Sequence, residues 1–416
     1  MIKTIEEVHY NPYFKVDKEQ FLDNKTVLFS EFNKDSITYT NFLATGMKLA
    51  AQLSGGHTQL SWQNRRVVSE LKNTYFLPFR GKLMNNNQQF VVTSSQIDGL
   101  KKGDVIKSIN GVNCVELYKE CLSFVGGIES FKSSICERLL PIYIYFTEKI
   151  SAPYVLNMEE KKISSNGLDF KETVEFLYQN FPKKKYTFKI LEDSIGLISY
   201  NNCQDLEAFK LFLDTTFTLL KTKKIDKLII DIRENGGGDS KLNDVLLSYI
   251  TNKPYRQSSG RYWKVSKQAK IKYKENGFED YFGKQFMDSY LKANNNSIIE
   301  SLDEELITPE KPTNYFEGTT CVLIGTNTFS SANFLADAIK TYKLSTLIGL
   351  PTGENTNDYG EILTFTLPHS GSEFHVSSTY DIGANGNSEL LQPVFPDIKV
   401  GKNTLEFAID WINKRD

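Results

Sequence analysis

The feature that most constrains the fold is a regular alternation of apolar, strand-like runs with segments of helical period after residue 185. The strand-like runs read YTFKIL, IGLISY, KLIIDI, TTCVLIG and STLIG, and helical patterns cover 205–221 and begin again after NGGGDS and at Ser330. Strands joined by crossover helices pair in parallel within one sheet. The sequence therefore predicts an α/β fold with a mostly parallel central sheet.

The chain before this alternation has different patterns. Residues 37–53 repeat apolar side chains at helical spacing, whereas short strands and turns are expected over 75–146. Within the latter, GLKKGDVIKSINGVNC predicts a strand at 105–109 and a hairpin turn at Asn110–Gly111. A polar insertion with helical patches fills 251–318. Three parts are expected, α+β overall: a helical N-terminal segment (1–74), a small β-rich domain (75–150) and an α/β core (151–416).

Bulk composition narrows the function classes. A net charge of −2, with lysines scattered among acids, gives no electrostatic reason to expect nucleic acid or an anionic membrane as partner. Five cysteines without a C-x-x-C pair support neither a disulfide scaffold nor a zinc site, and no metal or organic cofactor is expected. The longest apolar run, LLPIYIYF, is far too short to cross a bilayer, so no transmembrane segment is expected. The N-terminus lacks a signal-peptide core, so the protein is either cytoplasmic or has lost a leader.

Two segments carry residues that suit catalysis. KLIIDIRENGGGDS leads a buried strand into Gly236–Gly238, and consecutive glycines let backbone N–H groups approach an anion; a flexible turn is the alternative. In TNTFSSANF, Ser330 and Ser331 lie where a strand passes into a helix. Serine is a preferred helix cap there, but a nucleophile at the positive end of the helix dipole would also gain from the next N–H. The residues alone leave both interpretations open.

The order of these segments resembles a known family. DIRENGGG, TFSSANFLADAI and GLPTGEN, with GLKKGDVIKSINGV upstream, are similar to the C-terminal-processing (tail-specific) serine peptidases, relatives of the tricorn protease core. The family pattern is D-[LI]-R-x-N-x-G-G, then T-x-S-[AS]-[AS], then G-x-P-T-x-G-K with a lysine base. The resemblance covers Leu53 to Val400 and implies a ClpP/crotonase-like peptidase core. The upstream segment resembles the end of a PDZ domain, which implies a PDZ-like domain that binds substrate C-termini by strand addition.

Carried over position by position, the resemblance implies Ser330 as nucleophile and the N–H groups of Gly237 and Ser331 as the oxyanion hole. The chain departs from the pattern at the lysine, where Asn355 stands. An asparagine amide does not titrate, so it cannot act as the general base. The Ser–Lys pair of the family is therefore absent.

The segment SGGHTQLSW offers another base. It resembles the D-G-H-T segment of the tricorn-like branch, in which a histidine pairs with the serine, and His57 holds that position. A histidine suits this role near pH 7 when a carboxylate orients it. In NSELLQPVFPDIKV the resemblance points to Glu389 as this carboxylate, with Asp358 and Glu361 as alternatives. A helix C-cap role is the alternative for His57.

We therefore expect a tricorn-like, tail-specific serine endopeptidase that hydrolyses peptide bonds of peptide or protein substrates through an acyl-enzyme on Ser330. The alternative is an inactive, peptide-binding pseudo-peptidase. The loss of the lysine favours this alternative, whereas the retention of Ser330, His57 and the glycines opposes it. Bacterial relatives mostly work outside the cytoplasm, so the resemblance implies a periplasmic, cell-envelope or secreted protein whose leader has been removed; a cytoplasmic location is the alternative.

Overall fold

The computed structural model describes residues 1–30, 32, 37–53, 55–63, 65–192, 194–302 and 305–415. The chain forms two compact units, each assembled from separate stretches. We call them the N-terminal unit, made of Met1–Asn180, Val265–Ser297 and Glu361–Ser378, and the sheet unit, made of Phe181–Lys264, Ile298–Gly360 and Thr379–Asp416. The domain boundaries expected at residues 74 and 150 stay a prediction.

The sheet unit is built on a six-stranded sheet in the order β17-β14-β13-β10-β9-β8. All its strands except β8 run parallel to their neighbours. The strands are β8 (Tyr186–Leu191), β9 (Ile195–Tyr200), β10 (Lys227–Asp231), β13 (Thr319–Ile324), β14 (Thr346–Gly349) and β17 (Ile398–Lys399). The predicted mostly parallel sheet is thus confirmed, and the strand-like runs of the sequence form its strands.

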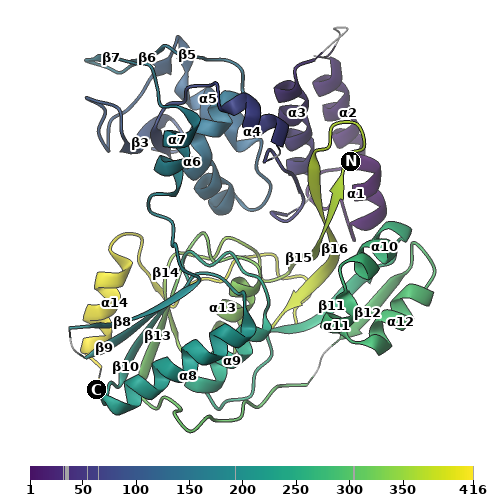
Figure 1. Ribbon diagram of the computed structural model, residues 1–416, viewed down its shortest axis with the longest axis vertical. Helices are drawn as coiled ribbons and strands as arrows, with labels where there is room; N and C mark the ends of the chain where they lie inside the picture. The colour runs from purple at the N-terminus through teal and green to yellow at the C-terminus, as the bar shows by residue number, and fades with distance from the viewer. Residues whose placement is uncertain are drawn as a thin grey trace. The chain divides into compact units, whose positions relative to one another are not determined.

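Helices cover both faces of this sheet (Figure 1). One face carries α8 (Leu206–Thr222), α9 (Lys241–Ile250) and α13 (Ser331–Tyr342), and the other carries α14 (Thr404–Asn413). Successive strand residues point to opposite faces, so Leu228 and Ile230 of β10 join the core under α8, α9 and α13, while Ile229 joins the core under α14. Because both faces are buried, the strands read as continuous apolar runs in the sequence.

The insertion over 251–318 contains two strands that the sequence did not predict. In the sheet unit, β11 (Ser258–Lys264) pairs antiparallel with β12 (Ile298–Leu302) and with the last residues of β16 (Glu373–Gly383). β15 (Asp358–Thr366) also pairs with β16. These pairings join distant parts of the chain, and strand propensity depends on such neighbours more than on local sequence. The helical patches of the insertion are α10 (Lys267–Glu275), α11 (Phe278–Phe282) and α12 (Lys284–Lys292).

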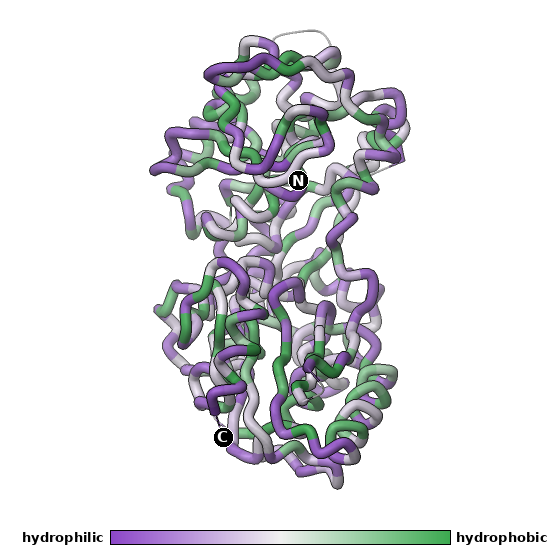
Figure 2. The backbone as a smooth tube through the Cα atoms, turned by 90° about the vertical axis from the view of Figure 1, so that its left-hand side faces the viewer, coloured by the Kyte–Doolittle hydropathy of each residue, from purple (hydrophilic) through white to green (hydrophobic). Residues whose placement is uncertain are grey.

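The N-terminal unit begins with helices, as predicted. The helix expected over 37–53 is α3 (Tyr39–Gln52), and its cap is Thr38, whose hydroxyl oxygen accepts the Asn41 N–H at 3.0 Å. Around it lie α1 (Ile2–Val8), α2 (Lys18–Ser30), β1 (Gln59–Leu60) and α4 (Arg65–Leu71). Hydrophilic and hydrophobic residues are interspersed along the chain (Figure 2). Among the described residues, no helix combines the length and the hydropathy needed to cross a membrane.

The rest of this unit contains hairpins and helices. The predicted turn at Asn110–Gly111 is confirmed, because both residues have positive φ, 50° and 84°, as a type I′ hairpin requires. The strand expected over 105–109 is confined to its end, β4 (Ser108–Ile109). The other elements are β2 (Phe79–Met84), β3 (Gln89–Ser95), β5 (Val112–Asn113), β6 (Tyr154–Asn157), β7 (Lys162–Ser165), α5 (Cys114–Leu122), α6 (Glu129–Phe146) and α7 (Phe170–Tyr178).

Helix α6 occupies a region for which short strands and turns were predicted, and that prediction was wrong. Its C-terminal half is the run LLPIYIYF, and most of these side chains are buried. This half of the helix is buried on most sides and has no polar face, so its sequence lacks the helical period that identifies an amphipathic helix.

Candidate active site

The sheet unit places Ser330 just beyond the carboxyl end of β13, directly before α13. The Thr328 hydroxyl fixes the loop between them, because it accepts the Gly325 N–H at 3.0 Å and donates to the Ile232 carbonyl at 2.9 Å. Ile232 follows β10, so this bond ties the loop to the end of the neighbouring strand. The carboxyl ends of parallel strands are where open α/β sheets place their sites.

The backbone of Ser330 has an unusual conformation, with φ 55° and ψ −127°. These are the angles of the first central residue of a type II′ turn, a position that normally requires glycine. Another residue held there stores about 1–3 kcal/mol of strain. The Ser330 side chain makes no capping hydrogen bond to α13, and a capping serine would have extended backbone angles. The structure therefore disfavours the helix-cap interpretation.

The glycine turn packs directly against this serine. Gly237 has φ +94°, and a Cβ added to it would lie 2.6 Å from the Ser330 Cβ and 2.9 Å from the Ser331 nitrogen. The Ser331 hydroxyl donates to the Gly238 carbonyl at 2.5 Å, which links the two turns. The Gly237 N–H donates to the Asn235 side-chain oxygen at 2.9 Å. Both predicted oxyanion-hole residues thus lie beside Ser330, and only a residue without a side chain fits at Gly237.

Buried polar groups hold both turns from behind. The fully buried Asn243 donates from its amide to the Ser331 carbonyl at 2.8 Å. The Cys203 N–H donates to the Gly237 carbonyl at 3.0 Å. Burial raises the pKa of the Cys203 thiol to about 11, so it is protonated at neutral pH and does not compete as a nucleophile.

The segment that matches the lysine-bearing pattern packs against the Ser330 turn. The Ser330 N–H donates to Glu354 Oε2 at 2.6 Å, and Glu354 is only 3% exposed. Asn355, at the lysine position, is also buried, and its carbonyl accepts from the Asn333 amide at 2.7 Å. Asn355 therefore provides no amine near Ser330, whereas its neighbour Glu354 provides a carboxylate that contacts the Ser330 backbone.

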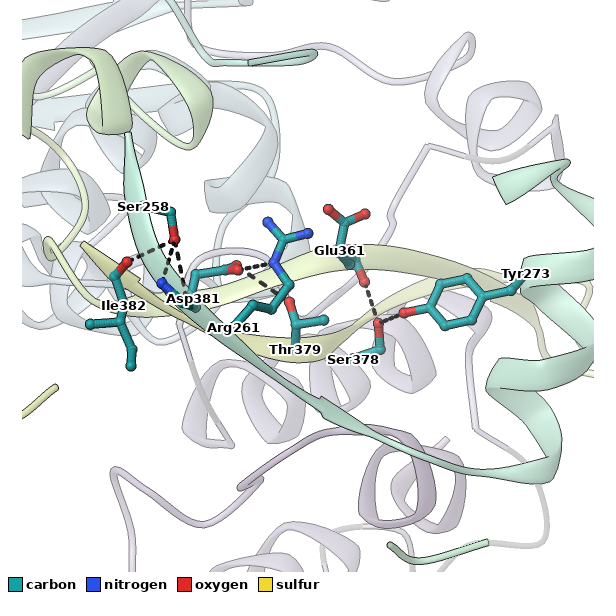
Figure 3. A network of polar contacts seen from close by, with 9 residues as sticks. Ser258, Arg261, Tyr273, Glu361, Ser378, Thr379, Asp381 and Ile382 are labelled. Carbon is teal, nitrogen blue, oxygen red and sulfur yellow. Dashed lines mark hydrogen bonds and ion pairs between the residues drawn. The ribbon is translucent and has the colours of Figure 1, made fainter. Parts of the chain in front are cut away.

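A buried ion pair lies near this segment. Arg261 of β11 pairs with Asp381 of β16, and the Thr379 hydroxyl donates to the same carboxylate (Figure 3). Burial raises the pKa of Asp381, Arg261 opposes the rise, and the charge of Glu354 adds to it. Arg261 is thus the counter-ion of the buried Asp381.

His57 belongs to the N-terminal unit. It lies in the turn between α3 and β1 and is buried, with 7% of its surface exposed. The C-cap of α3 is Leu53, so His57 does not cap this helix. The next residue, Thr58, accepts the Ser377 N–H on its hydroxyl oxygen at 3.2 Å, which holds the turn against β16. The pairing of His57 with Ser330 stays a prediction.

The three candidate carboxylates occupy different surroundings. Glu389 lies in an exposed turn after β16, where its N–H donates to Asn387 Oδ1 at 3.1 Å. Asp358, at the start of β15, is half-buried and accepts the Tyr359 N–H at 2.7 Å. Glu361 has a φ of 46° and belongs to the N-terminal unit, whereas the other two belong to the sheet unit. The choice of Glu389 as the orienting carboxylate also stays a prediction.

The profile of peptidase family S41 matches residues 194–400. Over these residues the chain belongs to peptidase family S41. The match contains the Ser330 turn, the glycine turn, the segment with Asn355 and Glu389, whereas His57 precedes it. Membership of S41 supports a serine peptidase and implies peptide or protein substrates.

Solved structures agree with the S41 assignment at the level of the fold. Mature CPAF in complex with lactacystin aligns over 99% of this chain and 95% of its own, with 13% identity and a TM-score of 0.66. A second structure of mature CPAF aligns over 99% and 94%, with 14% identity and a TM-score of 0.65. The photosystem II D1 C-terminal processing protease aligns over 99% and 95% at 13% identity, but its TM-score is only 0.45. No curated protein matches the chain by sequence.

Sequence reasoning missed three residues of this S41 site, namely Asn235, Asn243 and Glu354. Both asparagines are fully buried and hydrogen-bond to the turns. Asn235 is the asparagine of the family pattern D-[LI]-R-x-N-x-G-G, which was a signal in the sequence, whereas Asn243 lies outside the pattern. For Glu354 the signal was a departure from the family pattern. GLPTGEN places a glutamate where the family pattern G-x-P-T-x-G-K has its second glycine.

Proposed function

We propose that the protein is a serine endopeptidase that hydrolyses peptide bonds through an acyl-enzyme on Ser330. The observation that carries the proposal is the backbone of Ser330, which is held at φ 55° in a turn against Gly237, while its side chain makes no capping hydrogen bond to the helix. Strained conformations persist only where the surroundings impose them, and they cluster at active sites. A nucleophilic serine on a sharp strand-to-helix turn presents its Oγ in this way in other hydrolase folds.

In the proposed reaction, His57 takes the proton of the Ser330 hydroxyl as Oγ attacks the substrate carbonyl. The tetrahedral intermediate then collapses, the peptide nitrogen leaves with that proton, and Ser330 stays acylated. Water deprotonated by His57 attacks the acyl carbonyl, the Ser330 oxygen leaves and regains the proton, and the product acid is released. Glu389 is proposed to orient His57 and to stabilise the imidazolium.

The oxyanion would lie between the N–H groups of Gly237 and Ser331. Ser331 is the first residue of α13, where the helix dipole favours negative charge. The Gly237 N–H donates to Asn235 in this structure, so binding an oxyanion requires it to exchange that acceptor for the substrate oxygen. Donors aimed at the developing charge typically contribute about 2.7–4 kcal/mol each to catalysis.

We extend the proposal to the family branch and the substrate. The His57 segment supports the tricorn-like branch, because it supplies a base where Asn355 cannot. The antiparallel sheet β5-β4-β6-β7 and its Asn110–Gly111 hairpin support a PDZ-like module that binds substrate C-termini by adding a strand. The resemblance to tail-specific peptidases supports a periplasmic or cell-envelope location.

An inactive, peptide-binding pseudo-peptidase is the second candidate. The replacement of the family lysine by the buried Asn355 favours it, since the segment then supplies no base. The strained Ser330 opposes it, because a binding protein gains nothing from holding a serine at this cost in stability.

Labelling with a fluorophosphonate probe, followed by mass spectrometry, tests the proposal. We expect a single adduct on Ser330 in the wild type, no adduct in Ser330→Ala, and a strongly reduced rate in His57→Ala. His375→Ala is the matched control, because His375 belongs to the same unit and its ring nitrogen already bonds the Thr364 hydroxyl. Folded wild-type protein that acquires no adduct would contradict the peptidase and favour the binding protein.

A further inference from the structure

We infer that Glu354 is a positioning residue that holds the nucleophile's turn in its reactive conformation. The inference rests on the proposed function of Ser330 and adds to it a residue that the family pattern does not contain. The pattern has glycine at this position, which offers no side chain to the serine. The family pattern therefore does not account for this contact.

The contact is direct and protected from water. Glu354 Oε2 accepts the Ser330 N–H at 2.6 Å, and the side chain is buried. A carboxylate that accepts a backbone N–H forms a shorter and stronger bond than a neutral acceptor does. Because the N–H direction follows φ, the bond favours the strained backbone of Ser330 over an unstrained one.

Residues 353 and 355, on either side of Glu354, form hydrogen bonds to the turn before and after the serine. Before it, the Gly353 N–H donates to the Thr328 carbonyl at 3.0 Å. After it, the Asn333 amide donates to the Asn355 carbonyl at 2.7 Å. The segment that carries a lysine base in the family pattern thus holds the Ser330 turn through residues 353–355, and the Glu354 carboxylate accepts the N–H of Ser330 itself.

The test compares the rate constant of fluorophosphonate labelling in variants at two buried carboxylates. Glu354→Gln keeps an oxygen acceptor, and Glu354→Met fills the space without one. The matched control is Asp337, which lies on α13, is equally buried and accepts the Ala384 N–H at 2.7 Å, but does not contact Ser330. We expect labelling to slow about threefold in Glu354→Gln and about tenfold or more in Glu354→Met. Asp337→Asn and Asp337→Leu should label at the wild-type rate.

Amide hydrogen exchange of the peptide that contains Ser330 gives a second readout. The Ser330 amide hydrogen should exchange faster in Glu354→Met, which removes its acceptor, and should exchange as slowly as in the wild type in Glu354→Gln, which keeps an oxygen acceptor. If Glu354→Met does not fold, Glu354→Ala takes its place.

Wild-type labelling rates in Glu354→Met, faster labelling, or an equal loss in Asp337→Leu would each overturn the inference. If the wild type itself does not label, the proposed function fails and the positioning role fails with it. Faster exchange in Glu354→Met would then show that the contact still orders the turn.

Discussion

Replacing Gly237 with alanine would insert a methyl group where the glycine turn touches Ser330. The new Cβ would lie 2.6 Å from the Ser330 Cβ and 2.9 Å from both the Phe329 carbonyl oxygen and the Ser331 nitrogen. None of these atoms is the end of a flexible side chain, so the two turns must separate. A side chain at a φ of +94° costs about 1–2 kcal/mol, and overpacking typically adds about 1–3 kcal/mol. We expect Gly237→Ala to lower the free energy of unfolding by about 2–5 kcal/mol.

Separation of the turns should also impair the proposed oxyanion hole. Loss of one oxyanion donor typically costs about 10²–10³-fold in rate, so fluorophosphonate labelling of Ser330 should slow by about that factor. The assay pairs urea unfolding, followed by circular dichroism, with the labelling rate measured at low urea, where both proteins are folded.

The adjacent glycine is the control. A Cβ added to Gly236 would meet no heavy atom within 4 Å among the described residues, and its φ is not in the left-handed region. Gly236→Ala should therefore change the free energy of unfolding by no more than about 0.5 kcal/mol and leave labelling unchanged. Equal effects in the two variants would refute the argument from close packing, because they would indicate a general need for backbone flexibility. Wild-type stability and labelling in Gly237→Ala would also refute it.

Three further predictions concern buried groups. Burial raises the pKa of Asp337 from 3.8 to about 6, so the folded state binds the proton of this carboxyl group more tightly than the unfolded state does. The free energy of unfolding therefore falls as pH rises from about 4 to 6. Asp337→Asn should remove this dependence and be up to about 3 kcal/mol more stable than the wild type in urea unfolding at pH 7. Arg261→Ala should destabilise the protein by about 3–5 kcal/mol, because the buried carboxyl group of Asp381 loses its counter-ion, and adding Asp381→Asn should recover most of the loss in the same assay. All five cysteines are free and buried, so a thiol reagent should react with none of them in the native protein within minutes and with all five after denaturation.

The sheet unit could be predicted from the sequence because its signals are local. Each parallel strand is a continuous apolar run, and α8 shows the helical period that was read over 205–221. The β11–β12 pair could not be predicted in this way. Its strands are separated by three helices of the insertion, and β11 finds its other partner in β16, more than a hundred residues along the chain. The C-terminal half of helix α6 was missed because its burial on most sides leaves no polar face that would have identified it.

The candidate site was predictable where it depends on motifs. The position of Ser330 before a helix and beside the glycine turn followed from the order of DIRENGGG and TFSSANF. The contacts that hold the serine were not predictable, because Asn243 and Glu354 act through hydrogen bonds between residues that are far apart in sequence. A pattern records which residue types recur, but it does not record which carboxylate oxygen meets which N–H.

Magnitudes indicate why a carboxylate suits position 354. The backbone of Ser330 stores about 1–3 kcal/mol, and a neutral hydrogen bond contributes only about 0.5–1.5 kcal/mol net. A bond to a charged acceptor contributes about 1.5–3 kcal/mol, which matches the range of the strain. A neutral acceptor would thus offset only the lower half of that range. This chain has no lysine at the family position but has a strained serine, and the Glu354 carboxylate offsets the strain. The stability of the turn and the geometry of the nucleophile therefore depend on the same hydrogen bond, from the Ser330 N–H to Glu354.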